Sequence, residues 1–325
     1  MPSTLAVGVL LFSFFLFPFS LRVGAQSLQP DESIRIATDL VDLHVSVFSK
    51  DPTRPAGNLT LKDFIIFEDG AAQEIAFFAA AETPFDLVLL LDLSGSTSSK
   101  LNLIRKSAKR FVAAAPAADR IAVITFTDVP LLVAPLSSDR QLLNKAIDQI
   151  EKPAGGTNFW DSLHYVLESV LRSPARLPDY RRSAVIVMTD GIDNALPDVT
   201  GEGSRITFAE LIQVVRASDA IVVPIYLDTE QAEVKRRRVP ASAYVYAKQQ
   251  LNDLAQESGN VVYRAAEVKD LDHVYDQVIR DLRTVYSLGY RPANRTRDGA
   301  WRNVQVRLPT RPDLAIRAKR GYYAK

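Results

Sequence analysis

The sequence predicts an α/β protein in which a doubly wound, mostly parallel six-stranded sheet is inserted into a small β-sandwich-like domain. Three observations support this prediction. The middle of the chain alternates apolar runs of strand length with segments that carry apolar residues at helical spacing. Both ends of the chain have the pattern of short strands. Neither end has enough strands to close a sandwich alone, so we expect the N- and C-terminal strands to pair.

The middle segment contains six expected strands and six expected helices. Apolar runs predict strands at residues 85–92, 121–126, 131–135, 183–189, 221–227 and 261–264. Apolar residues at helical spacing predict helices at 101–114, 140–150, 160–171, 207–217, 241–258 and 271–282. This alternation is typical of a parallel sheet with helices on both faces.

The two ends of the chain show the two-residue period of half-buried strands. Residues 41–47 alternate apolar and polar side chains, and two further apolar runs, 64–67 and 75–78, flank Asp69-Gly70, which predicts a hairpin turn. C-terminal strands are expected at 285–290, 304–307 and 314–318. We therefore expect a β-domain made of residues 26–84 and 284–325, with an α/β domain, residues 85–283, between its two parts.

Composition excludes several classes of function. Of the 325 residues 47% are apolar and 24% are charged, which is ordinary for a globular protein. The 39 basic and 38 acidic residues nearly cancel, so no global field favours nucleic acid. The chain has no cysteine, which excludes disulfides, thiolate metal sites and cysteine nucleophiles.

Residues 1–25 have the pattern of a signal peptide. Residues 5–21 are almost wholly apolar, and Val23-Gly24-Ala25 before Gln26 fits a signal peptidase site. We expect export to the periplasm or the extracellular space, with no transmembrane span after signal removal. An uncleaved N-terminal membrane anchor is the alternative, because no Lys or Arg precedes the apolar stretch, although its length of about 17 residues is short for a spanning helix.

Three short motifs place oxygen-bearing side chains at strand ends and at a helix start. Asp92-Leu93-Ser94-Gly95-Ser96 follows an apolar run, Gly155-Gly156-Thr157 opens a helical stretch, and Thr189-Asp190-Gly191 ends a second apolar run. The three loops should converge at one edge of the sheet, where open α/β folds bind ligands. Carboxylates and hydroxyls are ligands of hard divalent cations. The motifs predict an all-oxygen metal site, whereas Asp-x-Ser-x-Ser alone could be a helix cap.

The five positions Asp92, Ser94, Ser96, Thr157 and Asp190 resemble the metal-ion-dependent adhesion site of von Willebrand factor type A domains and integrin I domains. The resemblance spans residues 84–283, and the whole chain is similar to the von Willebrand factor type A related family of secreted acidobacterial proteins. It implies a Rossmann-like fold in which 131–135 is a short antiparallel edge strand. It also implies that Asp92 and Asp190 hold the ion through water, while an Asp or Glu of a partner fills the sixth position.

The chemistry of these ligands indicates how the cation would act. The hydroxyls of Ser94, Ser96 and Thr157 are neutral, so the ion keeps most of its charge and needs one more anionic oxygen. Mg²⁺ suits this set because it keeps waters and prefers six oxygens, and Mn²⁺ or Ca²⁺ are alternatives. A direct bond from Asp190 would weaken partner binding. We therefore expect an extracytoplasmic adhesion or complex-assembly module that binds a carboxylate of a partner protein.

Two other functions remain open at this stage. The metal could only stabilise an envelope or secretion-associated scaffold. A Mg²⁺-dependent hydrolase with Ser94 as nucleophile would need a base, and no His or Lys lies near the three loops in sequence. Phosphate-loop, dinucleotide, nucleophile-elbow and zinc-helix motifs are also absent from the sequence. We expect no catalytic residues and no enzymatic activity.

Residues beside the three motifs have competing interpretations. Asn158, Asp193 and Asn194 are candidates for partner contact, but Asn158 and Asp161 could instead cap a helix, and Asp193-Asn194 could form a turn. Gly155 and Gly156 are expected to let the Thr157 loop approach the ion closely. The basic cluster 235–238 is interpreted as a solvated loop rather than a polyanion contact. The three histidines, His44, His164 and His273, are not expected to bind metal.

Overall fold

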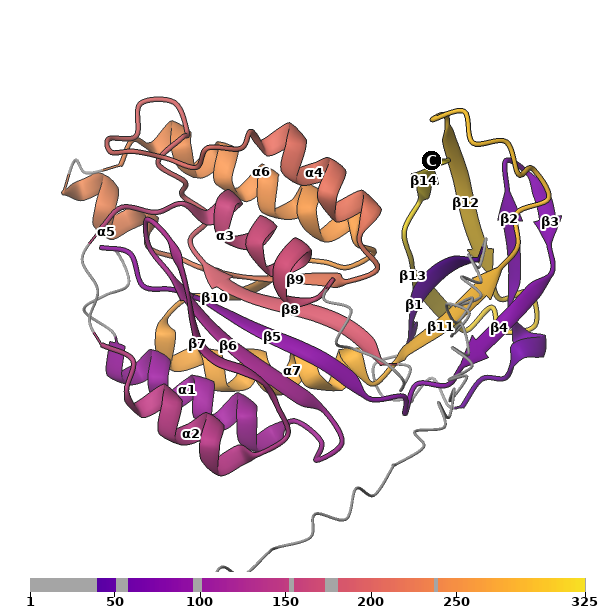
Figure 1. Ribbon diagram of the computed structural model, residues 1–325, viewed down its shortest axis with the longest axis horizontal. Coiled ribbons are helices and arrows are strands. Elements are labelled where there is room, and N and C mark those ends of the chain that lie inside the picture. The colour runs from indigo at the N-terminus through magenta and orange to yellow at the C-terminus, as the bar shows by residue number, and fades with distance from the viewer. Residues whose placement is uncertain are drawn as a thin grey trace, which may run out of the picture. The chain divides into compact units, whose positions relative to one another are not determined.

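The computed structural model describes residues 40–50, 58–95, 101–151, 155–172, 181–236 and 239–324 (Figure 1). The predicted signal peptide and the predicted metal ligand Ser96 lie outside the described residues.

The central sheet has six strands in the order β10-β9-β8-β5-β6-β7. Its strands are β5 (Phe85–Asp92), β6 (Arg120–Phe126), β7 (Pro130–Ser137), β8 (Arg182–Thr189), β9 (Ile221–Leu227) and β10 (Tyr263–Ala265). All neighbours pair in parallel except β6 and β7, which are antiparallel. The predicted fold class and the antiparallel edge strand are confirmed. Every residue of β5 and β8 is buried, as expected for strands that are covered on both faces.

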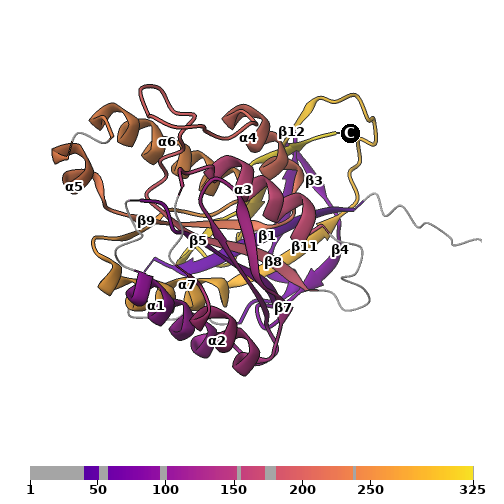
Figure 2. The ribbon, with the colours of Figure 1, turned by 60° about the vertical axis from the view of Figure 1, so that its left-hand side comes forward.

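Helices cover the two faces of this sheet (Figure 1 and Figure 2). One face carries α1 (Leu101–Ala114), α2 (Arg140–Asp148) and α7 (Leu271–Leu282), and the other carries α3 (Phe159–Tyr165), α4 (Phe208–Ala217) and α6 (Ala241–Glu257). Alternate residues of β5 pack against the helices on the two faces of the sheet. Leu87 and Leu89 join the core under α1, whereas Val88 and Leu90 join the core under α3.

Two local structures differ from the expectations. The predicted helix 160–171 consists of α3 followed by a π-helical turn, Val166–Val170. The basic cluster begins inside a short helix, α5 (Glu230–Lys235), rather than in a loop. Glu233 of this helix is almost fully buried and pairs with Arg236 at 2.9 Å.

The N- and C-terminal strands form two antiparallel sheets, as predicted. One has the order β13-β1-β11-β4, and the other has the order β14-β12-β2-β3. The strands of the first sheet are β1 (Val41–Ser49), β4 (Ile75–Ala79), β11 (Val285–Tyr290) and β13 (Leu314–Arg317). Those of the second are β2 (Ile65–Glu68), β3 (Ala71–Gln73), β12 (Trp301–Arg307) and β14 (Gly321–Tyr323). Apolar residues of both sheets share one core, and β1 pairs only with C-terminal strands.

The predicted turn at Asp69-Gly70 is confirmed, but its strand partners are not those expected. Asp69 and Gly70 both have positive φ, 47° and 85°, as a two-residue hairpin turn requires. The turn joins β2 to β3, whereas β4 pairs with β11 in the other sheet. The alternation of apolar residues indicates which face of a strand is buried and does not indicate its partner.

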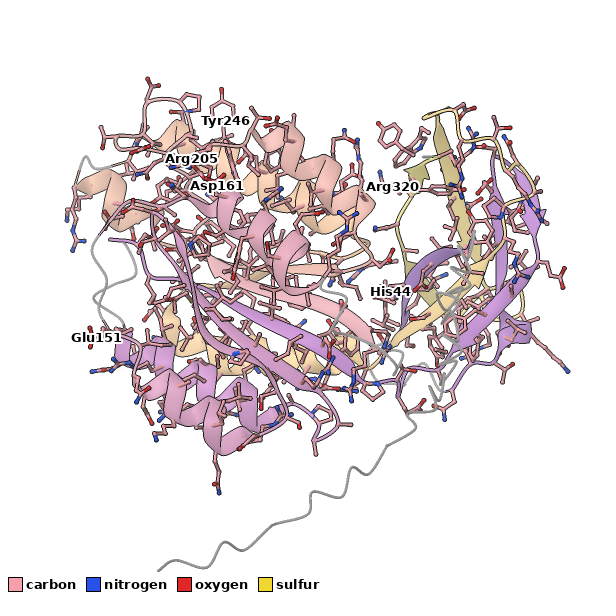
Figure 3. The ribbon with its side chains drawn as sticks, in the orientation of Figure 1. His44, Glu151, Asp161, Arg205, Tyr246 and Arg320 are labelled. Carbon is pink, nitrogen blue, oxygen red and sulfur yellow. The ribbon has the colours of Figure 1, made fainter. Side chains whose placement is uncertain are left out.

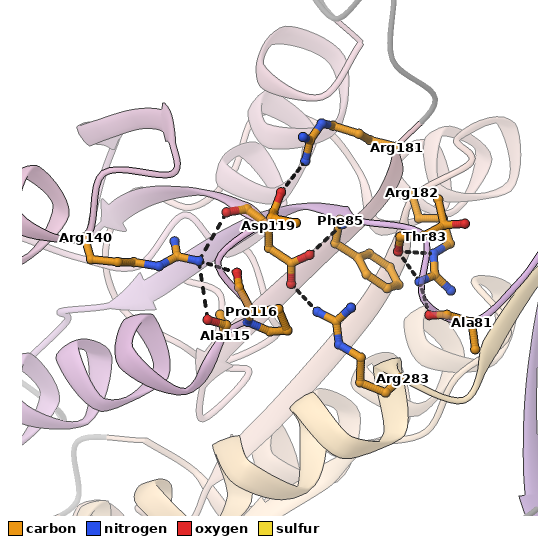
Figure 4. A network of polar contacts seen from close by, with 11 residues as sticks. Ala81, Thr83, Phe85, Ala115, Pro116, Asp119, Arg140, Arg181, Arg182 and Arg283 are labelled. Atoms are coloured by element: carbon orange, nitrogen blue, oxygen red, sulfur yellow. Dashed lines mark hydrogen bonds and ion pairs between the residues drawn. The ribbon is translucent and has the colours of Figure 1, made fainter.

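The chain passes between the two systems of strands at a buried polar network (Figure 4). Arg182, at the start of β8, donates to the carbonyls of Ala81, Thr83 and Val285. Asp119 accepts a hydrogen bond from the amide of Phe85 at 2.9 Å and pairs with Arg283. Both crossings of the chain are therefore fixed at the amino ends of β5 and β8, away from the edge where the predicted ligands lie.

Candidate metal centre

Asp92 and Asp190 meet at the carboxyl ends of two neighbouring strands. β5 and β8 run in parallel with Leu91 opposite Met188, so Asp92 ends one strand beside the loop that follows the other. This edge lies toward α5, at the left in Figure 1. Asp92 is fully buried, and Asp190 is 2% exposed. The strand order therefore brings two of the predicted ligands together.

The carboxylate of Asp92 is held by the protein on both oxygens. The amide of Ser94 donates to Oδ1 at 2.9 Å, and Thr189 Oγ1 donates to Oδ2 at 2.6 Å. Burial, followed by the negative charge of Asp190, raises the pKa of Asp92 from 3.8 to about 7. A cation between the two carboxylates would remove this repulsion.

Asp190 is held in the same manner by residues outside the predicted motifs. The amide of Ile192 donates to its Oδ1 at 3.2 Å, and Thr229 Oγ1 donates to its Oδ2 at 2.6 Å. The hydroxyl of Tyr244 lies 2.9 Å from the same threonine oxygen. Thr229 and Tyr244 were missed in the sequence. The signal for Thr229 was its position just after a further parallel strand, β9, at the same edge of the sheet.

The Thr157 loop reaches this edge through backbone contacts with its neighbours. Both it and the Asp92 loop bond to the end of β6: Leu93 N donates to Phe126 O at 3.1 Å, and Asn158 N donates to Thr127 O at 2.8 Å. The carbonyl of Thr157 accepts from Asn194 N at 2.9 Å, which ties it to the Asp190 loop. Thr157 is 6% exposed and Ser94 is 5% exposed. Four of the five predicted ligands thus belong to one loop cluster.

The two glycines before Thr157 are needed for packing against neighbouring side chains. A Cβ at Gly155 would lie 2.1 Å from Asp128 Oδ2, and a Cβ at Gly156 would lie 2.2 Å from Asn194 Nδ2. The amide of Gly156 donates to Asp128 Oδ1 at 2.6 Å. Asp128 is a further residue that sequence reasoning missed. The close contacts of these glycines are thus with Asp128 and Asn194, and the expected close approach of the Thr157 loop to an ion stays a prediction.

Asp193, Asn158 and Asn194, which were candidates for partner contact, differ in burial and in hydrogen bonding. Asp193 is fully buried and accepts hydrogen bonds from Trp160 N, Ala195 N and both Ser204 N and Oγ. It therefore caps α3 and forms a turn, rather than facing a partner. Asn158 occupies the N-cap position of α3 without a side-chain cap bond, and its buried Oδ1 has no hydrogen-bond partner within the described part of the chain. Asn194 is half-buried beside Gly156.

Asp161 and the histidines lie apart from the candidate ligands. Asp161 accepts hydrogen bonds from the amides of Arg205 and Ile206, and Figure 3 shows Asp161 and Arg205 close together. His44 is on β1, where its ring contacts Ser287 Oγ at 3.0 Å. Burial lowers the pKa of His44 to about 4, which keeps the ring neutral.

The residues present fit an oxygen-ligated divalent cation. Across the residues described, no three His, Asp or Glu side chains form a group that could hold a metal ion. A cation here would therefore need the hydroxyls of Ser94 and Thr157, and water, in addition to the two aspartates. The mutual repulsion of Asp92 and Asp190 favours a cation between them.

Comparison with known proteins identifies the domain that carries this loop cluster. The model of the von Willebrand factor type A domain family matches residues 86–277, more than half of the chain. The chain belongs to this family. All three predicted metal loops fall inside the type A domain. No helix among the described residues of the protein is both long and apolar enough to span a membrane.

Several solved structures resemble this type A domain protein. Proximal thread matrix protein 1 from the mussel byssus is 18% identical with a TM-score of 0.48, over 66% of this chain and 50% of that chain. BatB from Bacteroides thetaiotaomicron is 15% identical with a TM-score of 0.44, over 61% and 98% of the two chains. The von Willebrand factor domain of the type V pilus tip protein from Porphyromonas gingivalis is 15% identical with a TM-score of 0.45, over 61% and 94%.

The present chain spans about half of the length of the mussel protein. One structure of that mussel protein is described with zinc in its metal-ion-dependent adhesion site.

Proposed function

We propose that this type A domain protein binds a partner protein through a divalent cation at the Asp92, Ser94, Ser96, Thr157 and Asp190 loops. The observation that carries the proposal is the buried pair Asp92 and Asp190. Each of their carboxylate oxygens already accepts a hydrogen bond from the protein. Such anchored carboxylates suit binding through water, whereas neutral hydroxyls serve as direct ligands. When bound, the cation would supply a positive charge for a carboxylate of the partner.

The ligand types favour Mg²⁺ or Mn²⁺, with Ca²⁺ as the alternative. Every candidate ligand is an oxygen, and the chain has no cysteine. Hard oxygen ligands favour these ions over softer metals. The exported location predicted from residues 1–25 remains a prediction. In an exported protein, such a site would serve adhesion or complex assembly.

Binding without catalysis is the proposed mode of action. Ser94 would need a base to act as a nucleophile. The three histidines of the chain are on β1, α3 and α7, and none is in the loops that carry Asp92, Thr157 and Asp190. We therefore propose that the Ser94 hydroxyl binds the ion and does not attack a substrate.

The metal can be tested by calorimetry with Mn²⁺ on the full chain. Asp92→Asn and Asp190→Asn should each weaken binding by at least about tenfold, because each removes a negative charge from the site. Asp198→Asn is the matched control. Asp198 is exposed and has a positive φ of 63°, which asparagine tolerates, so this variant should bind as the unaltered protein does. Equal binding by all four proteins would refute the site.

The partner can be sought in the envelope fraction of the source organism. Immobilised protein should retain a partner in Mg²⁺ and release it in chelator, and Asp92→Asn should fail to retain it while Asp198→Asn succeeds. If Mn²⁺ binds but the retained proteins are the same with and without chelator, the metal only stabilises the fold of a scaffold protein and does not bind the partner.

A further inference from the structure

Thr229 and Tyr244 form a buried connection between α6 and Asp190. Thr229 Oγ1 donates to Asp190 Oδ2 at 2.6 Å and lies 2.9 Å from the hydroxyl of Tyr244. Thr229 is two residues beyond β9, and Tyr244 is in the first turn of α6. Thr229 is 5% exposed and Tyr244 is fully buried. Solvent has little access to replace either hydrogen bond.

The direction of this hydrogen-bond chain follows from its protons. Thr229 has a single hydroxyl proton, which it gives to Asp190, so Tyr244 must donate to Thr229. Burial raises the pKa of Tyr244, and the charge of Asp190 raises it further, so the phenol keeps its proton. Each donor strengthens the next in such a chain. Tyr244, on α6, thereby helps to orient the carboxylate of Asp190 through the hydroxyl of Thr229.

A second contact ties the same helix to the Asp190 loop. Gly191 follows Asp190 with a φ of +78°, and a Cβ at this position would lie 2.9 Å from Leu251 Cδ1 and 3.2 Å from the Cβ of Ala247. Both of these residues belong to α6. The loop therefore packs directly on the helix, so a shift of α6 must displace Asp190.

We propose that Thr229 and Tyr244 are positioning residues of the metal centre, which orient Asp190 and couple the bound cation to the first three turns of α6. This inference rests on the proposed function, since it requires a cation at Asp92 and Asp190. Coupling between two sites is reciprocal: if α6 orients Asp190, the cation must in turn steady α6. The helix exposes Val245 and Tyr246, 65% and 49%, so the effect reaches the protein surface.

Calorimetry of the full chain with Mn²⁺ tests the positioning role. Thr229→Val keeps the shape but removes the donor, and it should weaken Mn²⁺ binding by about 10- to 100-fold, as loss of an outer contact to a metal ligand typically does. Thr229→Ser restores the hydroxyl and should bind within about threefold of the unaltered protein. Tyr244→Phe removes one oxygen and should have an intermediate effect. It also supplies a second variant if Thr229→Val does not fold.

Tyr275→Phe is the matched control. Tyr275 is fully buried on α7, and its hydroxyl has no hydrogen-bond partner among the described residues, so this change should leave Mn²⁺ affinity unaltered. Equal Mn²⁺ affinity in Thr229→Val, Tyr244→Phe and the unaltered protein would overturn the inference. Absence of Mn²⁺ binding by the unaltered protein would instead refute the proposed function.

Amide hydrogen exchange tests the coupling to α6. If Thr229 only stabilised the fold, its replacement would not change the effect of Mn²⁺ on exchange in α6. Mn²⁺ should slow exchange in residues 241–251 of the unaltered protein and of Tyr275→Phe. In Thr229→Val, saturated with Mn²⁺ at a correspondingly higher concentration, this protection should be lost or strongly reduced. Equal protection of α6 in Thr229→Val and the unaltered protein would show that the cation acts on the helix by another route and would overturn the coupling.

Discussion

The guanidinium carbon of Arg182 lies 4.1 Å from the centre of the Phe85 ring. Arg182 is fully buried, and its donors reach the carbonyls of Ala81 and Thr83, before β5, and of Val285, at the start of β11. One side chain thus holds both segments that connect the type A domain to the antiparallel sheets. The stacking over Phe85 adds a cation–π contact at a site with little solvent.

Replacing Arg182 should therefore uncouple the two systems of strands. Arg182→Met leaves two buried carbonyls and one partly buried carbonyl without this donor, at about 1 to 3 kcal/mol for each buried group, so the free energy of unfolding should fall by at least about 2 kcal/mol. The two tryptophans report separately, because Trp160 is in α3 and Trp301 is in β12. In urea unfolding of single-tryptophan variants, the Trp160 and Trp301 transitions should coincide when residue 182 is arginine. They should separate in Arg182→Met.

Arg181→Met is the control for this prediction. The neighbouring Arg181 makes one exposed hydrogen bond, to Ala118 O at 2.7 Å, so its loss should change the free energy of unfolding by under about 1 kcal/mol. Equal destabilisation by the two variants would argue against a special role for Arg182.

The antiparallel sheets should fail together when their C-terminal part is lost. A chain that ends at Arg283 lacks β11 and β13, the two partners of β1, and β11, the partner of β4. Limited proteolysis should then cut within β1 and β4. Leu288→Asp is a milder form of this test, since Leu288 is fully buried in β11. It should accelerate amide exchange in β1 and β4 while β5 and β8 stay protected; protection of β1 and β4 in both proteins would contradict a shared domain.

The stability of the metal-free protein should depend on pH through Asp92. Its pKa is raised from 3.8 to about 7, so the folded state binds the proton more tightly than the unfolded chain does. This contribution is fully present below about pH 4 and is lost as the pH rises to about 7. A difference of this size is worth on the order of 4 kcal/mol.

The measurement is urea unfolding in chelator from pH 4 to pH 8, with Asp92→Asn beside the unaltered protein. The difference between the two curves reports the buried pair of Asp92 and Asp190 and removes the contribution of distant titrating groups. The free energy of unfolding of the unaltered protein minus that of Asp92→Asn should fall from pH 4 to pH 8, because only the unaltered protein must lose a buried proton. A difference that stays constant with pH would mean that Asp92 does not titrate in this range.

The partner should contribute a carboxylate to the cation. Once a partner is isolated, changing its exposed Asp and Glu residues singly to Asn and Gln should identify one at which affinity drops. Loss of one member of a desolvated charged contact costs about 2 to 5 kcal/mol, or roughly thirty-fold to several thousand-fold in affinity. Survival of binding through all of these changes, or in chelator, would contradict a bridging cation.

The sequence predicted the sheet and the pairing of the two ends because these depend on local apolar periodicity and strand number, whereas the antiparallel edge strand was implied by the resemblance to type A domains. It also indicated the Asp92, Thr157 and Asp190 loops, because short motifs at strand ends and at a helix start can be recognised from the sequence alone. Asp128, Thr229 and Tyr244 were missed because each acts on a residue far away in sequence: Asp128 on Gly156, Thr229 on Asp190 and Tyr244 on Thr229. Such contacts exist only after the chain has folded.

The errors have physical reasons of the same kind. β4 was placed next to the Asp69-Gly70 hairpin because it is the first apolar run after that turn, yet the short strand β3 lies between them and the partner of β4, β11, lies far along the chain. The short helix α5 has little apolar periodicity, and its contacts are largely polar, such as the pair of Glu230 with Lys248 on α6, far along the chain. Asp193 could be a turn residue or a partner contact in the sequence. In the structure it accepts from Trp160 N of α3 and from Ala195 and Ser204, contacts that the sequence does not reveal.

Strand β5 joins the two ends of the type A domain. It begins at Phe85, beside the crossing to the antiparallel sheets, and ends at Asp92. Parallel neighbours flank it, with registers that run from Asp86 to Asp92 on β6 and from Phe85 to Leu91 on β8. A tensile load between a partner held at Asp92 and the antiparallel sheets would run along the covalent backbone of β5, so the hydrogen bonds to β6 and β8 would not have to break to carry it. The strand that would present the aspartate to a partner would also carry the load through the domain.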